Sequence, residues 1–424
     1  MSDHTVVVVG AGLAGLETAR QLAADGIDAT VFEASAEVGG RVRTEKRDGF
    51  TFDRGFQVLF TAYPEAKRAL DFSALDLKRF PPGAIVCRPN HRSVVADPLR
   101  DPAHAIETAF SRDLTLGDKL EVLKLRQALR GRSRDEIYTG PDVTIEEYLQ
   151  TRGFSKRFIE AFAAPFYGGI TLDRNLSTSS RVFQYTFRML TEGSAAVPKA
   201  GMQAIPRQLA RRAKAEGARI ETETSVEAID AESEVTVHLT GETITADAVV
   251  VAAGPEESRR LTELESVPEA GRGVHTQYFR LPDGNPLAKQ GRIHLNAAEA
   301  VPNQVVSLSA VAPSYAPGSE GLVAASTNSQ VDRDPAWIAD HTREVLSSWY
   351  PAVSFDSLEL LETTSIPFAQ YDQPPGIHET LPDVDSPEGA VYLAGDITTD
   401  SSINGALRSG REAAAVVTRN ETSQ

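Results

Sequence analysis

Thr5-Val6-Val7-Val8-Val9 runs directly into Gly10-Ala11-Gly12-Leu13-Ala14-Gly15, and a second apolar run ends at Glu33. This order predicts a strand, a glycine turn, a helix, a second strand and an acid at its end. A βαβ unit of this kind binds dinucleotides, with the acid accepting hydrogen bonds from ribose hydroxyls. The stretch therefore predicts an α/β fold that holds a dinucleotide. An ordinary βαβ turn is the alternative, and it leaves Glu33 without a role.

The three glycines of this turn have separate purposes. Gly10 permits the tight turn after the strand, Gly12 lets a pyrophosphate approach bare backbone, and Gly15 lets the helix lie close to the sheet. Leu13 and Ala14 fall in the first turn of the helix, where unpaired N–H groups and the positive end of the helix dipole attract phosphate. We therefore expect all five residues to bind the cofactor.

The composition describes a globular protein with several domains. The chain has 424 residues, of which 41% are apolar and 24% charged, and this length suits two or three domains of ordinary size. The 59 acidic and 43 basic residues give a net charge of −16. Nucleic acid binding relies on neutralising phosphates with basic side chains. The charge therefore argues against a nucleic acid partner.

Cysteine and histidine usage points away from metal chemistry. Cys87 is the only cysteine, which excludes an internal disulfide, and the eight histidines show no metal-ligand spacing. The longest apolar runs fall short of the roughly 20 residues that span a bilayer. No basic and apolar leader precedes Thr5. We expect no metal, and a cytoplasmic protein with room for a peripheral contact with a membrane.

A second glycine turn follows the acid that ends the second predicted strand. Gly39 and Gly40 allow backbone to lie close to a ligand, and Arg41, with Arg43 two residues on, can neutralise a pyrophosphate. The alternative is a simple Gly-Gly turn with a solvated arginine.

The C-terminal part repeats the arrangement of strand, turn and helix. The strand predicted over 390–396 ends at Gly395-Asp396, and a helix is predicted over 403–418. Asp396 can accept hydroxyls from an extended sugar chain, which FAD has and a nicotinamide dinucleotide lacks. The start of the helix, including Ile403, Asn404 and Ala406, would direct its positive end at an electron-rich ring. The alternative role for Asp396 is to cap the following turn.

Between these ends the pattern changes twice. Residues 98–190 read mostly as helices, and a helix over 114–129 would place Leu116, Leu120, Leu123 and Leu129 on one face. Aromatic residues from Phe154 to Phe187 fit either a helix core or a tunnel for an apolar substrate. Further on, the sequence predicts helices over 202–216 and 335–349, and a strand buried on both faces within 247–254.

Together these segments resemble the FAD-dependent amine oxidase superfamily, within it the branch of phytoene and zeta-carotene desaturases and protoporphyrinogen oxidase. The matching pieces are Val9 to Leu16, Glu33 with Gly39-Gly40-Arg41, Gly201 to Pro206, Ile366 to Tyr371, and Gly395-Asp396 with Asn404-Gly405-Ala406. They span nearly the whole chain. The Gly395-Asp396 pair is closer to the desaturase side than to amine oxidases proper, which tend to carry Gly-Glu there.

The resemblance implies a fold and a domain plan. It implies an α/β fold in which a Rossmann-like FAD-binding domain of the GR2 type is interleaved with an α+β substrate domain. The FAD-binding domain would comprise residues 1–75, 196–270 and 385–424. The substrate-binding domain would comprise residues 76–195, mostly helical, and 271–384.

The resemblance also assigns roles to residues. Glu33 would bind the adenosine ribose, the Val226 backbone the adenine, Arg41 the phosphates or flavin edge, and Asp396 the ribityl or pyrophosphate part. Ile403 to Ala406 would lie near the flavin ring. Cys87 is far in sequence from the C-terminal motif, so the expected FAD is non-covalent.

The implied function is a flavin-dependent oxidation. Flavin N5 would accept hydride from an apolar substrate, carotenoid-like or tetrapyrrole-like, with oxygen or a quinone as electron acceptor. Gln57 and Tyr371 are the candidate catalytic residues. Alternatives are an amine oxidase that forms an imine and hydrogen peroxide, a flavin-dependent double-bond isomerase, and a carrier of the same fold without redox chemistry.

Overall fold

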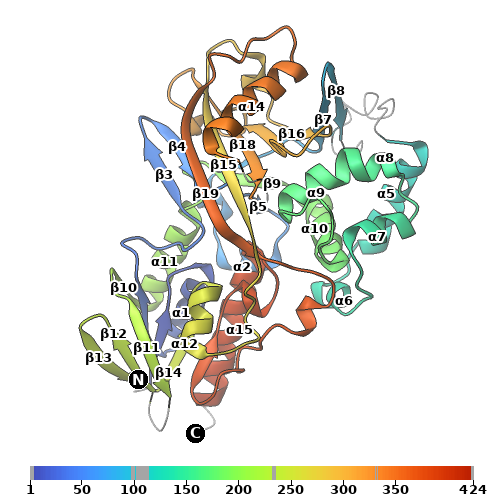
Figure 1. Cartoon of the computed structure of the whole chain (residues 1–424). Helices are drawn as coiled ribbons and strands as arrows, with labels where there is room; N and C mark the ends of the chain where they lie inside the picture. The colour runs from blue at the N-terminus through green and yellow to red at the C-terminus, as the bar shows by residue number, and fades with distance from the viewer. Residues whose placement is uncertain are drawn as a thin grey trace.

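The computed structural model describes residues 4–96, 101, 114–231, 235–329, 331 and 333–421. Three regions are visible in Figure 1: a lower body around α1 and α15, an upper sheet that includes β15, β18 and β19, and a group of helices from α5 to α10 at one side.

The lower body is built on a five-stranded parallel sheet. Its strand order is β10-β2-β1-β14-β20, and every neighbouring pair is parallel. The strands are β10 (Arg219–Thr222), β2 (Asp28–Glu33), β1 (Thr5–Val9), β14 (Ala248–Val251) and β20 (Val391–Leu393). The sheet thus joins segments from both ends and the middle of the chain. As predicted, β14 is buried on both faces.

Alternate residues of β1 enter two different cores. Val6 and Val8 face α1 (Leu13–Ala24), which packs against α11 (Ala204–Glu216) and α15 (Ile403–Glu421). Val7 and Val9 face a second core that includes a three-stranded antiparallel sheet. That sheet consists of β11 (Val226–Ala231), β12 (Val235–Leu239) and β13 (Glu242–Ala246). Because successive side chains of a strand point to opposite faces, β1 contributes to the cores on both faces of the parallel sheet.

The upper sheet has seven strands and is antiparallel except for the β16–β7 pair. Its order is β19 (Glu359–Tyr371), β15 (Gly271–Leu281), β18 (Gly321–Asn328), β17 (Gln304–Ser307), β16 (Ile293–Asn296), β7 (Ala84–Arg88) and β8 (His91–Val95). Helix α14 (Pro335–Trp349) shares a core with one face of this sheet. Cys87 is buried in that core.

Most of the helices at the side begin at a side chain that caps the first turn. They are α5 (Leu116–Leu129), α6 (Arg134–Tyr138), α7 (Ile145–Thr151), α8 (Lys156–Phe158), a π-helical turn η2 (Ile159–Ala163), α9 (Ala164–Ile170) and α10 (Ser180–Glu192). Thr115 and Ser133 form capping boxes with Asp118 and Glu136. Smaller elements connect the regions. They are β3 (Thr44–Arg47), β4 (Phe50–Asp53), β5 (Leu59–Phe60), β6 (Leu77–Arg79), β9 (Ala195–Pro198), α2 (Pro64–Ala69), α3 (Phe72–Leu75), α12 (Pro255–Thr262), α13 (Leu308–Val311), η3 (Pro286–Lys289), η4 (Pro313–Tyr315), η5 (Ile377–Glu379) and η6 (Asp396–Thr398).

One predicted helix face was wrong. Leu116, Leu120, Leu123 and Leu129 of α5 were predicted to share one face, but the first three side chains are 83%, 53% and 51% exposed, whereas Leu129 is buried. Asp118 is fully buried instead, because its carboxylate accepts hydrogen bonds from the backbone N–H groups of Thr115 and Ser155, at 2.7 Å each. The three exposed leucines therefore face outward.

The aromatic residues favour the core interpretation over the tunnel. The rings of Phe154, Phe158, Phe162 and Phe166 stack in sequence, with centroids 4.6, 5.5 and 5.2 Å apart. Phe183 continues the group through Tyr167, at 4.6 Å. These rings therefore pack against one another, as in a helix core. No helix among the described residues is both long and apolar enough to cross a lipid bilayer.

Candidate functional site

The glycine turn after β1 leaves open space where a ligand would lie. A Cβ added to Gly15 would come within 2.0 Å of the Gly10 carbonyl oxygen, and one added to Gly10 within 2.9 Å of the Ala252 carbonyl oxygen. These two glycines are therefore required by close packing. A Cβ added to Gly12 would meet no atom within 4 Å. Gly12 is also the N-cap of α1, where no side chain satisfies the first N–H groups.

Glu33 is held at the end of β2 beside this turn. Its carboxylate oxygens accept hydrogen bonds from the Ala11 N–H at 2.8 Å and the Ser35 N–H at 2.9 Å. Each oxygen keeps a second lone pair for a further donor. The segment that leads into β11 also lies beside Glu33, because the Thr224 N–H donates to the Glu33 carbonyl at 3.0 Å. Val226, the first residue of β11, follows it directly.

The second glycine turn closes over the first. The Gly39 N–H donates to the Ala11 carbonyl at 2.8 Å. A Cβ added to Gly40, which has a φ of +57°, would lie 3.4 Å from the Gly12 Cα. The two turns therefore bring bare backbone together.

Arg41 and Asp396 form an ion pair between segments 355 residues apart. The Arg41 Nη2 lies 2.5 Å from the Asp396 Oδ1, and its Nη1 donates to the Ala369 carbonyl at 3.1 Å. The charge of Asp396 raises the pKa of Arg41 above its ordinary value. Asp396 also accepts a hydrogen bond from the Ser401 hydroxyl at 2.8 Å. This pair joins the second glycine turn to the segment before α15.

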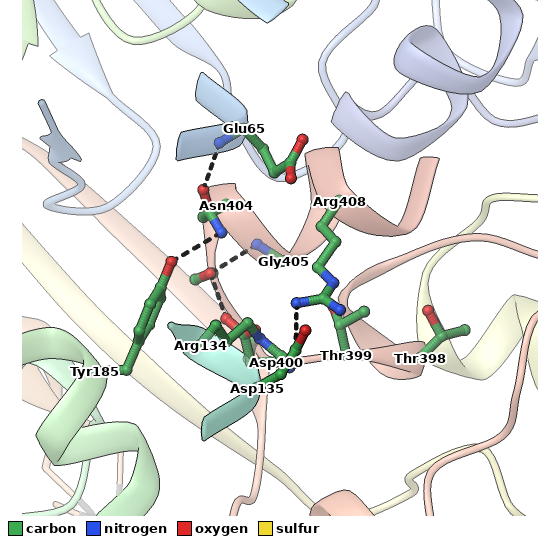
Figure 2. Close-up of polar contacts among 12 residues, drawn as sticks. Glu65, Arg134, Asp135, Tyr185, Thr398, Thr399, Asp400, Asn404, Gly405 and Arg408 are labelled. Carbon is green, nitrogen blue, oxygen red and sulfur yellow. Dashed lines mark hydrogen bonds and ion pairs between the residues drawn. The ribbon is translucent and has the colours of Figure 1, made fainter. Parts of the chain in front are cut away.

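The start of α15 is fixed by close contacts. The Asn404 amide accepts from the Glu65 N–H at 3.0 Å and donates to the Tyr185 hydroxyl at 3.1 Å (Figure 2). A Cβ added to Gly405 would lie 2.0 Å from the Asp400 carbonyl oxygen. Ile403 begins the helix, and the Ala406 N–H donates to the Ser402 carbonyl at 3.0 Å. The buried side chain of Asn404 is thus used within the protein.

A small cavity of about 40 Å³ lies beside the start of α15. Its walls come from the segments before α2 and α15, from α6, α9 and α10, and from β19. The lining residues are Tyr63, Tyr138, Ile170, Thr171, Val182, Tyr185, Thr186, Gln370, Gln373, Asp400, Ser401 and Ser402.

Two ion pairs lie behind this cavity. Arg134 Nε is 2.7 Å from Asp400 Oδ1, and Arg408 Nη1 is 2.8 Å from Asp135 Oδ1 (Figure 2). Burial by itself would raise the pKa of Asp400, but the Arg134 guanidinium lowers it below its ordinary value. The hydroxyl of Ser402 adds a hydrogen bond to Asp400 at 2.6 Å. Consecutive residues of α6 thus connect to α15 and to the turn before it.

The two candidate catalytic residues lie outside the cavity walls. The Gln57 amide donates to the carbonyl oxygens of Arg41 and Arg54, at 2.9 and 3.1 Å. Tyr371 is 1% exposed, and its hydroxyl lies 3.5 Å from the Thr399 carbonyl oxygen. Gln57 is therefore placed to support the Arg41 backbone, and Tyr371 to fill space near Asp396.

Sequence reasoning missed the residues that form the cavity. Asp400, followed by two serines just before a helix, carried a readable signal, because such residues cap helix starts. Tyr63, Tyr138 and Tyr185 come from three separate segments that no sequence spacing relates. Within the described ranges, no group of three or more His, Cys, Asp and Glu side chains could hold a metal ion.

Comparison with known proteins decides the family. A sequence model described as flavin containing amine oxidoreductase matches residues 13–418. The chain belongs to the flavin containing amine oxidoreductase family. It is accordingly an FAD-dependent oxidoreductase. The resemblance expected from the sequence motifs is confirmed.

Relatives of this flavin containing amine oxidoreductase match only parts of it. Protoporphyrinogen oxidase 2 of Arabidopsis thaliana is 31% identical over 172 residues, which are 40% of this chain and 33% of the plant protein. A 4,4'-diapophytoene desaturase of Staphylococcus haemolyticus is 54% identical over 50 residues, which are 12% of this chain and 10% of that enzyme. The chain thus matches a third or less of the length of these curated relatives.

Solved structures of similar fold cover the whole oxidoreductase. A putative protoporphyrinogen oxidase from Exiguobacterium sp. 255-15 superimposes with a TM-score of 0.72 over 100% of both chains, at 17% identity. Putrescine oxidase bound to putrescine gives a TM-score of 0.73, covering 98% of this chain and 99% of the other, also at 17% identity. Likeness at this identity shows the fold, an α/β arrangement of mixed sheets and helices.

The residues present in this oxidoreductase fit FAD. The open space at Gly12, the uncapped start of α1 and the free lone pairs of Glu33 suit a pyrophosphate with its ribose. Arg41, which follows the second glycine turn, adds a positive charge. The turn before α15 and the cavity beside that turn would receive the other end of the FAD molecule.

Proposed function

We propose that this protein removes hydride from an organic substrate with an extensive apolar body, carotenoid-like or tetrapyrrole-like, and passes it to non-covalently bound FAD. When bound, FAD supplies a hydride acceptor at flavin N5. The observation that carries the proposal is the Arg41–Asp396 pair at 2.5 Å, because it connects the dinucleotide turn to the start of α15 beside a cavity.

Residues of this chain would hold each part of the FAD molecule. Gly12, Leu13 and Ala14 would receive the pyrophosphate at the start of α1, and Glu33 the adenosine ribose. Val226 would contact the adenine, and Asp396 the ribityl chain. Ile403 and Ala406 would lie near the ring, while the Ser402 hydroxyl already accepts the Gly405 N–H at 2.8 Å.

The proposed domain plan follows from how the sheets divide the chain. All strands of the five-stranded parallel sheet fall in 1–75, 196–270 and 385–424, which we propose as a Rossmann-like FAD-binding domain of the GR2 type. All strands of the seven-stranded sheet fall in 76–195 and 271–384, which we propose as the substrate-binding domain. Cys87, buried in the seven-stranded sheet, supports non-covalent binding.

We also propose oxygen or a quinone as electron acceptor, a cytoplasmic location and a peripheral contact with a membrane. The outward leucines of α5 support this contact, because exposed Leu116, Leu120 and Leu123 recur at helical spacing and would enter a bilayer surface together. Isolated exposed leucines are ordinary, but three on one helix face are not.

The test is anaerobic reduction of the flavin in the purified protein. Phytoene, protoporphyrinogen and a panel of amines are added separately, and bleaching of the oxidised flavin spectrum is followed. We expect a compound of one of the first two classes to bleach it. Bleaching by amines alone, with an imine product, would favour the amine oxidase. A flavin that no compound reduces would contradict the proposal.

A further inference from the structure

A groove of about 280 Å³ lies between α11 and β10, two neighbouring elements of the lower body (Figure 1). Its apolar lining consists of Val38, Ala210 and Ile220. Ala210 is buried, whereas Val38 and Ile220 are half-buried and leave apolar surface in the groove. The volume is just below the roughly 300–1,000 Å³ of sites for drug-sized molecules, so the groove suits a smaller ligand.

The charged side chains that line this groove are all basic. Arg207, Arg211 and Lys214 follow one another at spacings of four and three residues, so they share one face of α11. No acidic residue lines the groove, although the whole chain has 59 acidic residues and 43 basic ones. The groove is therefore positive in a protein that is negative overall.

Two of these three positive charges are not neutralised by the protein. Arg207 Nη2 lies 3.1 Å from the Glu37 Oε1, and this pair compensates one charge. The side chains of Arg211 and Lys214 are exposed and make no hydrogen bond or ion pair with any other described residue. Both cations are therefore free to meet an anion in the groove.

Going beyond the proposed oxidation, we propose that this groove binds a small phosphate monoester with an apolar body. A phosphate monoester carries a charge of about −1.5 to −2 at pH 7, which Arg211 and Lys214 together would balance. Its apolar body would cover Val38 and Ile220 and remove their surface from water. A carboxylate would balance only one of the two charges, and inorganic phosphate would leave the apolar surface uncovered.

The groove is next to the proposed adenosine end of FAD but separate from it. Thr222, which lines the groove, pairs in register with Glu33, the residue proposed to bind the adenosine ribose. None of the residues that we assign to FAD lines the groove. The experiment therefore uses the full-length, FAD-loaded protein, in which the cofactor site is already filled.

The test compares four probes by isothermal calorimetry at low salt: phenyl phosphate, benzoate, inorganic phosphate and benzyl alcohol. One exposed ion pair changes affinity by about threefold. We expect phenyl phosphate to bind at least about threefold tighter than benzoate or inorganic phosphate, and about tenfold tighter than benzyl alcohol. Added salt should weaken the binding of phenyl phosphate and leave that of benzyl alcohol unchanged, because salt screens exposed charges.

Charge-removing variants locate the site. Arg211→Gln and Lys214→Gln should each weaken phenyl phosphate about threefold, and the double variant about tenfold, with benzyl alcohol unchanged. Both side chains are exposed, so the fold should not be affected. Lys67→Gln is the matched control, because Lys67 is an exposed lysine of α2 outside the groove. It should change neither affinity.

Several results would overturn the inference. They are binding of benzoate, inorganic phosphate or benzyl alcohol as tight as that of phenyl phosphate, and an unchanged affinity for phenyl phosphate in the double variant. The FAD content of each protein is measured before titration, and loss of FAD from the double variant would assign the groove to the cofactor site instead. A protein that binds phenyl phosphate as expected, but whose flavin no substrate reduces, would contradict only the proposed function.

Discussion

At the residue scale, Asp396 depends on the partners that surround it. Its side chain is 6% exposed, and Arg41 and Ser401 each contact one of its carboxylate oxygens. A buried carboxylate is costly unless it is paired and hydrogen-bonded. Arg41 therefore stabilises the turn before α15.

A buried histidine should make the protein sensitive to acid. His294 is fully buried, its Nε2 lies 2.7 Å from the Tyr350 hydroxyl, and burial lowers its pKa to about 4. The unfolded chain would bind a proton at this site near pH 6.5. Between about pH 6.5 and 4 the unfolded state holds the extra proton, so the free energy of unfolding falls as pH is lowered, by up to about 3 kcal/mol.

Urea unfolding at several pH values checks this, with His294→Gln as the comparison. Glutamine keeps a donor and an acceptor but does not titrate, so the variant should lose that part of the pH dependence. His378 remains in both proteins, and its pKa is also lowered to about 4 by burial. Parallel curves for the two proteins between pH 6.5 and 4 would refute the assignment.

Single residues were predictable where one local rule decides them. Gly10 and Gly15 are dictated by close backbone contacts, and Glu33 by its place at the end of β2. The partnership of Arg41 with Asp396 was not predictable, because it forms only when two strands of one sheet, distant in sequence, are brought together. The same is true of Tyr63, Tyr138 and Tyr185.

At the element scale, α15 is positioned by its contact with α1. A Cβ added to Gly410 would lie 2.3 Å from the Ala14 carbonyl oxygen, and the Thr18 hydroxyl donates to the Gly410 carbonyl at 3.1 Å. The two helices therefore cross with almost no side chain between them. This crossing fixes the start of α15 relative to the dinucleotide turn.

Gly410→Ala should force these helices apart. Overpacking of this kind costs about 1–3 kcal/mol, so the Tm and the free energy of unfolding should both fall. Ala415→Ser on the exposed side of α15 is the control and should change stability by less than about 0.5 kcal/mol. A Gly410→Ala protein as stable as the control would show that the helices are not in close contact.

Helices were predictable where their ends are marked, and less so where burial is decided by polar contacts. The bounds of α14, Pro335–Trp349, agree with the prediction, because Asp334 caps it and Pro335 occupies its first turn. For α5 the existence of the helix was predicted, but the prediction wrongly placed the buried Leu129 on the same face as the three exposed leucines. A carboxylate that bonds two backbone N–H groups outweighed the leucine spacing.

At the scale of the whole molecule, the chain crosses repeatedly between two sheets. The parallel sheet takes strands from residues 5–33, 219–251 and 391–393, and the upper sheet takes strands from residues 84–95 and 271–371. The α/β class and this interleaving were predictable from buried strands and glycine turns. The strand order of the upper sheet was not, because its pairings join residues far apart in sequence.

The outward face of α5 should bind lipid. We expect the protein to sediment with phosphatidylcholine vesicles, and the triple variant Leu116→Ser, Leu120→Ser and Leu123→Ser to remain in solution, since it lacks the apolar stripe. Gln127→Ser on the same helix is the control and should sediment like the parent. If the parent and the triple variant sediment equally, this face does not contact the membrane.

The central claim is that the turn at Gly12 holds the FAD pyrophosphate, and Gly12→Ala tests it most directly. No protein atom lies within 4 Å of the added methyl group, so the apoprotein should keep its Tm, while the methyl would occupy the pyrophosphate's place. Gly117→Ala, in the first turn of α5 with only an ordinary contact at 3.4 Å, is the control. The measurement is the FAD content of each purified protein after reconstitution with excess FAD and removal of what is unbound. We predict one FAD per chain in the parent and in Gly117→Ala, and almost none in Gly12→Ala. A Gly12→Ala protein that retains FAD like the parent would contradict the account.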